Sequence, residues 1–180
     1  MGKVILDMAM SIDGIVTDKK GNYLYPINEL KNSEELNDLI NNVGAVVMDK
    51  ACYDMAGGDF INYEYQAPIF IFAKTVPKKV AKGENDKLSF TFVTNNIKET
   101  VAKAKKAAKK KNVMIVGWVG AAQQCLKNGL IDEIIIRLMP VLVGKGKKLL
   151  ENFGTKEIKF EMIDAKYFST RTDVKLIIKK

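Results

Sequence analysis

The chain has 180 residues, with 29 lysines and arginines against 21 aspartates and glutamates, a formal net charge of +8, and no histidine. The absence of histidine excludes Ser-His-Asp and Cys-His catalysis and imidazole metal ligands, so acid–base chemistry would depend on Asp, Glu, Lys, Tyr, Cys or water. At about 100–200 residues per domain, the length predicts one domain over residues 1–180 with a full apolar core.

The first quarter of the chain predicts a strand, a loop and a helix. Residues 3–10 are an apolar run that ends at the turn signal Asp13-Gly14, and the polar residues 19–32 have the composition of a loop. Apolar residues at helical spacing then predict a helix that starts at Asn32 or Ser33 and ends at Gly44, a position that suits a C-terminal glycine.

From residue 45 onward, short apolar runs alternate with helical patterns. The predicted strands are 45–48, 68–72, 90–93, 113–116 and 131–138, and the predicted helices are 50–58, 96–111 and 117–129. The last two strands, 156–165 and 173–179, are predicted to form an antiparallel hairpin. This alternation indicates an α/β fold in which helices flank a central, mostly parallel sheet.

The basic residues are almost all lysines, since only Arg137 and Arg171 are arginines. Proteins that read nucleic acid favour arginine, because its planar fork binds guanine and phosphate bidentately. The lysine-rich helix 98–111 also has no aromatic side chain on which bases could stack. We therefore expect a solvent-exposed helix face there, and not a nucleic-acid partner.

Two cysteines, Cys52 and Cys125, are too few for a four-thiolate metal site, and we expect no bound metal. Such sparse cysteine use is typical of reduced thiols in the cytoplasm. The N-terminal residues do not resemble a signal peptide, and every apolar stretch is shorter than the ~20 residues that span a bilayer. We expect a cytoplasmic protein without a membrane partner.

Four strand-to-helix junctions are the candidate binding positions, because ligands of such sheets bind at the carboxyl ends of the strands. Their backbone N–H groups favour anions, and together they would suit a dinucleotide. They do not contain the full G-x-G-x-x-G fingerprint, so a Rossmann-type NAD site is not favoured. The junctions are Met48-Asp49-Lys50, Ala73-Lys74-Thr75, Val93-Thr94-Asn95-Asn96 and Gly117-Trp118-Val119-Gly120.

Three motifs, in this order and spacing, resemble a known family. Met10-Ser-Ile-Asp-Gly14 resembles S-x-D-G, Gly117 with Gly129-Leu-Ile-Asp-Glu133 resembles G-G…G-L-[IV]-D-E, and Pro140-Val-Leu-Val-Gly-Lys-Gly146 resembles P-V-L-x-G-x-G. The chain resembles the RibD C-terminal domain family, the reductase domain of a bifunctional riboflavin-biosynthesis enzyme, in its stand-alone form. The resemblance implies the fold of dihydrofolate reductase.

The resemblance also implies an NADPH-dependent reductase, usually a homodimer, that acts on a small pteridine- or pyrimidine-like substrate. It places Ser11 and Asp13 beside nicotinamide and substrate as catalytic residues. On local evidence alone, Asp13 is better explained as a turn residue. The cofactor contacts that the resemblance implies are Asp49, Lys50, Cys52, Lys74, Thr75, Thr94, Gly117, Trp118, Val119, Gly120 and Ala121.

Two motifs depart from the family pattern and support a different hypothesis. The family commonly has Gly-Arg-x-Thr where this chain has Asp49-Lys50-Ala51-Cys52, and a second glycine where it has Trp118. The aspartate adds negative charge where phosphates would lie. The second hypothesis is therefore a non-catalytic or altered-ligand member that has lost standard NADPH binding. A nucleic-acid-associated protein, the third, rests on charge alone.

Overall fold

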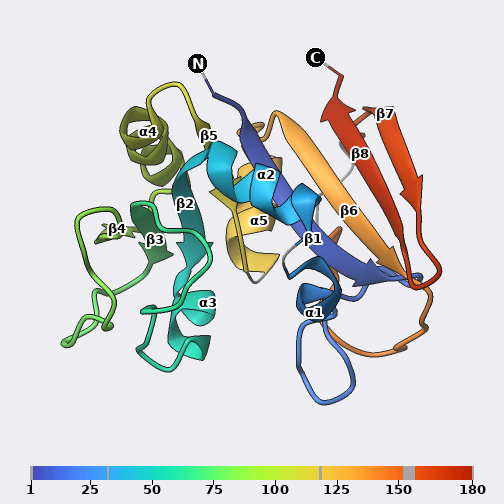
Figure 1. Ribbon diagram of the computed structural model, residues 1–180, viewed down its shortest axis with the longest axis horizontal. Coiled ribbons are helices and arrows are strands. Elements are labelled where there is room, and N and C mark those ends of the chain that lie inside the picture. Colours follow the sequence, from blue (N-terminus) through green and yellow to red (C-terminus); the bar gives the residue numbers. More distant parts are fainter. Residues whose placement is uncertain (1, 32, 118, 152–156, 180) are drawn as a thin grey trace.

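The computed structural model describes residues 2–31, 33–117, 119–151 and 157–179, and these residues form one eight-stranded sheet flanked by helices (Figure 1). The strands are β1 (Val4–Ser11), β2 (Val43–Asp49), β3 (Ile69–Ala73), β4 (Phe90–Thr94), β5 (Asn112–Ile115), β6 (Glu133–Met139), β7 (Phe160–Tyr167) and β8 (Thr172–Ile178). The helices are α1 (Ile27–Leu30), α2 (Glu34–Asn42), α3 (Lys50–Met55), α4 (Ile97–Ala108) and α5 (Val119–Lys127).

The sheet has the order β4-β3-β2-β5-β1-β6-β8-β7. The six strands from β4 to β6 are parallel, and β8 and β7 add an antiparallel hairpin at one edge. The predicted fold, a mostly parallel α/β sheet with an antiparallel C-terminal hairpin, is confirmed. Because all the parallel strands end at the same edge, the junctions after β1, β2 and β5 meet there.

Each face of the sheet has its own layer of helices (Figure 1). Alternate residues of β1 point to opposite faces, as the period of a strand requires: Leu6 packs with α4 and α5, whereas Ile5 faces the side of α2 and α3. The central strands are buried on both faces, which explains why their sequences are continuous apolar runs. Among the described residues, none of the helices is both long and apolar enough to cross a membrane.

The helix caps explain where several elements begin. The Ser33 side chain accepts a hydrogen bond from Leu36 N and starts α2, while the alternative cap, Asn32, lies outside the described residues. Asn96 caps α4 in the same way through Glu99 N. The lysines of α4 lie on its outer side and Val101, Ala104 and Ala108 are buried, as predicted.

Two local predictions are wrong. Gly44 does not end α2 in a left-handed conformation, because β2 begins directly at Val43 and includes Gly44. An added Cβ at Gly44 would come within 2.8 Å of the Ala108 carbonyl oxygen, so the glycine allows β2 to approach the end of α4. The polar segment predicted as a loop contains the short helix α1.

A buried cluster of charged side chains joins β1, α2, β6 and β8. Arg137 is fully buried and donates from Nε and Nη2 to the two oxygens of Asp7, both at 2.9 Å. Its Nη1 donates to Glu35 at 2.9 Å and to Asp173 at 2.6 Å. Arg171 donates to the other oxygen of Asp173 at 2.9 Å. Both arginines of the chain therefore belong to one network.

We predict that Arg137→Met lowers the free energy of unfolding by about 3–5 kcal/mol, because the buried carboxylates of Asp7 and Asp173 lose their main partner. Urea denaturation followed by circular dichroism measures this. As a matched control, Lys103→Met breaks an exposed i,i+4 pair with Glu99 and changes stability by less than about 0.5 kcal/mol. Equal effects of the two substitutions would contradict a structural role of the network.

Candidate functional site

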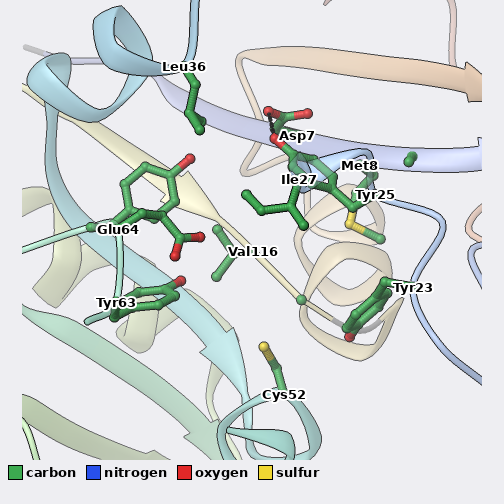
Figure 2. Close-up of a pocket in the computed structure, with 13 residues that line it drawn as sticks. Asp7, Met8, Tyr23, Tyr25, Ile27, Leu36, Cys52, Tyr63, Glu64 and Val116 are labelled. Atoms are coloured by element: carbon green, nitrogen blue, oxygen red, sulfur yellow. Dashed lines mark hydrogen bonds between the residues drawn. The ribbon is translucent and has the colours of Figure 1, made fainter. Parts of the chain in front are cut away.

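A cavity of about 340 Å³ opens at the carboxyl ends of β1 and β5, on the face of the sheet that carries α2 (Figure 2). Its walls come from β1, from α1 and the segment before it, from the first turns of α2 and α3, from the loop that follows α3, and from the residues after β5. The lining residues are Asp7, Met8, Ala9, Tyr23, Tyr25, Ile27, Leu36, Cys52, Tyr63, Glu64, Tyr65, Val116 and Gly117.

Four tyrosines line this cavity, which we call the tyrosine-lined cavity. Tyr23 and Tyr25 lie on one side of it and Tyr63 lies on the other (Figure 2). Tyr65, from the same loop as Tyr63, also lines it. Burial raises the pKa of all four phenols, so each stays neutral. Aromatic and aliphatic walls with a few polar groups are characteristic of small-molecule sites. This cavity therefore suits a planar organic ligand better than an ion.

The carboxylate of Asp7 is held firmly at the cavity wall. It receives the two hydrogen bonds from Arg137 and one from the Tyr25 hydroxyl at 2.7 Å. Burial raises the pKa of Asp7, and the Arg137 guanidinium and the Tyr25 hydroxyl oppose that rise. Asp7 therefore fixes the position of Tyr25, and through it one side of the cavity.

Glu64 is the second carboxylate of the cavity and the one aimed into its space (Figure 2). Within the described residues, its carboxylate makes no hydrogen bond to another side chain, and Glu64 as a whole residue is exposed at the mouth of the cavity. Partial desolvation raises its pKa. Glu64 is thus an acceptor available to a ligand. Sequence reasoning missed it, because nothing in the polar loop after α3 shows which side chain turns inward.

The predicted cofactor residues divide into two groups. Asp49, Cys52, Gly117, Gly120 and Ala121 come together where α3 and α5 begin. An added Cβ at Gly117 would lie 2.3 Å from the Cys52 sulfur, so the two junctions pack directly on each other. The rest are separate: Lys50 pairs with Asp54 at 2.7 Å, Val119 is buried in the core, and Lys74, Thr75 and Thr94 are exposed at the ends of β3 and β4. Trp118 lies outside the described residues.

Asp49 occupies the point where the two helices begin. Its Oδ1 accepts a hydrogen bond from Cys52 N at 2.8 Å, and its Oδ2 accepts one from Ala121 N at 3.4 Å. Burial raises the pKa of Asp49, and the N–H groups of Cys52 and Ala121, the positive charge of Lys147 and the N–H group of Gly120 oppose the rise. These N–H groups are the ones that an anionic cofactor would need. The residues present therefore do not fit a diphosphate at this point.

Ser11 and Asp13 are brought together, but not at the cavity. The Ser11 hydroxyl donates to Asp13 at 2.7 Å, and Asp13 accepts from Val143 N at 3.2 Å and Gly144 N at 2.8 Å. These bonds hold the 140–146 loop against the end of β1 and lower the pKa of Asp13 to about 2. Neither residue lines the cavity. Within the described chain, no three Cys, Asp or Glu side chains are grouped to hold a metal ion.

The eight-stranded sheet has the fold of dihydrofolate reductase, with the tyrosine-lined cavity beside its strand ends. Residues 2–176 match the RibD C-terminal domain, and the chain belongs to that family. The chain is 23% identical to the uncharacterized protein YyaP of Bacillus subtilis, over 93% of this chain and 90% of that protein.

Two solved structures show the same arrangement. A putative riboflavin biosynthesis protein from Shewanella sp. PV-4 is 26% identical, with a TM-score of 0.81 and coverage of 99% of both chains. The riboflavin biosynthesis reductase Rib7 of Saccharomyces cerevisiae is 12% identical, with a TM-score of 0.67, over 99% of this chain and 90% of that one. At this lower identity, the second likeness concerns the fold alone.

We predict that Asp13→Ala accelerates hydrogen exchange of the Val143 and Gly144 amides roughly tenfold, because both lose a charged acceptor. NMR-detected exchange measures this. Asp18→Ala is the control, since Asp18 accepts from Lys20 N and Asn22 N in another turn. Asp18→Ala should accelerate exchange only at the Lys20 and Asn22 amides.

The same contact predicts a pH dependence. The folded pKa of Asp13 is about 2, below its ordinary value near 4, so its stabilisation is complete above about pH 4. It is lost as the pH falls through about 2. The protection of Val143 and Gly144 should therefore persist at pH 4 and decrease towards pH 2. Loss of protection already between pH 6 and pH 5 would contradict this.

Proposed function

We propose that this protein binds a small planar heterocycle of the pyrimidine or pteridine type in the tyrosine-lined cavity and acts on it as a reductase. The observation that carries the proposal is the Glu64 carboxylate, which is aimed into a cavity walled by tyrosines at the strand ends. A carboxylate can accept two parallel hydrogen bonds from a ring nitrogen and its neighbouring amino group. The tyrosine rings supply apolar faces for the heterocycle.

The reaction class comes from the family. Membership of the RibD C-terminal domain family favours reduction, and NADPH is the reductant that the family implies. With no histidine in the sequence, a proton for the reduced ring would come from a carboxylic acid, a tyrosine or water.

We predict that Glu64→Gln weakens the binding of an aminopyrimidine or aminopteridine probe by about 10- to 100-fold, because a charged acceptor of two hydrogen bonds is lost. Isothermal titration calorimetry measures the affinities. Glu34→Gln is the matched control, because Glu34 is exposed on α2 and does not line the cavity. This substitution should leave the probe affinity within about twofold of the wild type. Unchanged binding in Glu64→Gln would remove Glu64 from the site.

A second measurement tests the reaction. NADPH fluorescence, or energy transfer from Trp118, the only tryptophan, is followed while NADPH is added. A saturable signal, with heterocycle-dependent oxidation of NADPH, is expected of a reductase. No saturable signal up to roughly millimolar NADPH, the upper end of ordinary KM values, would overturn the reductase assignment. It would favour the second candidate, an altered-ligand member, which the position of Asp49 supports.

A further inference from the structure

We propose that Asp49 is a built-in anion that competes with diphosphate-bearing ligands for the N–H groups at the start of α3 and α5, and so sets the affinity of this chain for dinucleotides. The inference does not depend on the heterocycle proposal, because Asp49 is not among the residues that line the tyrosine-lined cavity. It concerns the neighbouring stretch of the same sheet edge.

The geometry leaves little room for a second anion. Both oxygens of Asp49 are already engaged, Oδ1 by Cys52 N at 2.8 Å and Oδ2 by Ala121 N at 3.4 Å. Gly120 approaches so closely that a Cβ there would lie 2.7 Å from Oδ2. The Asp49 residue is 8% exposed. A phosphate oxygen could reach these N–H groups only after the Asp49 carboxylate had moved away.

Two lysines lie near Asp49. The positive charge of Lys147 acts on Asp49 and opposes the rise of its pKa. Lys50, the basic side chain next to it, is directed to both oxygens of Asp54 at 2.7 Å. A phosphate that approaches the N–H groups at the start of α3 and α5 would therefore meet the negative charge of Asp49, at a position where the family has a glycine. Because the carboxylate is part of the chain, it competes at an effective concentration that a free ligand rarely reaches.

The test compares the binding of inorganic pyrophosphate and of NADPH to the wild type and to two variants, by isothermal titration calorimetry. Asp49→Gly removes the competing anion, and a glycine cap preserves most of the stability of the helix start. Both ligands should bind at least about tenfold more tightly to it than to the wild type. Asp49→Asn keeps an acceptor for Cys52 N but removes the charge, so its gain should be smaller.

Asp59→Asn is the matched control, because it makes the same charge change at an exposed aspartate that accepts from Ile61 N. Its affinity for pyrophosphate should stay within about twofold of the wild type. Equal pyrophosphate affinity in the wild type and both Asp49 variants would overturn the inference, as would an equal gain in Asp59→Asn. If Asp49→Gly does not fold, Asp49→Asn alone decides. Probe binding in the tyrosine-lined cavity, measured without pyrophosphate, separates this result from the proposed function.

Discussion

Burying the guanidinium of Arg137 costs several kcal/mol of lost hydration unless its N–H groups find acceptors. Here they find Asp7, Glu35 and Asp173, which come from β1, α2 and β8. These acceptors are themselves buried or half-buried, so each would be costly without the guanidinium. Among 29 basic residues only two are arginines, and both lie in this network. A planar fork with five donors can satisfy several carboxylates at once, whereas a lysine ammonium cannot.

The cavity wall depends on the same network. Asp7 lines the cavity and orients Tyr25, whose ring also lies 5.4 Å from the Arg137 guanidinium. Glu35 brings α2 onto β6, and the next residue, Leu36, lines the cavity. Glu29 of α1 is tied to Arg171 at 2.8 Å. The side of the cavity formed by α1 and α2 is therefore held by ion pairs, since these short helices bury few apolar side chains of their own.

The elements that could be predicted are those whose causes are local. Apolar runs predicted β1, β2 and β5, and capping side chains predicted the start of α4, because periodicity and caps act within a few residues. The role of Gly44 within β2 could not be predicted, since the residue that it leaves room for, Ala108, belongs to another helix. Asp7 and Arg137 are 130 residues apart, and Glu64 lies in a loop without periodicity. The roles of Asp7, Arg137 and Glu64 depend on contacts between distant parts of the chain, and a local sequence pattern does not predict such contacts.

The edge of the sheet is chemically unlike the rest of the molecule. The net charge is +8, yet Asp7 of β1, Asp49 at the end of β2 and the loop residue Glu64 bring carboxylates to this edge, while the lysines of α4 lie on the outer side of that helix. A net charge describes the long-range field, whereas a bound ligand meets the groups within a few ångströms. At that range, the edge offers acceptors and aromatic faces. The proposed function therefore favours donor-rich, uncharged or cationic heterocycles, and in the role proposed for Asp49 a polyanion must first displace its carboxylate.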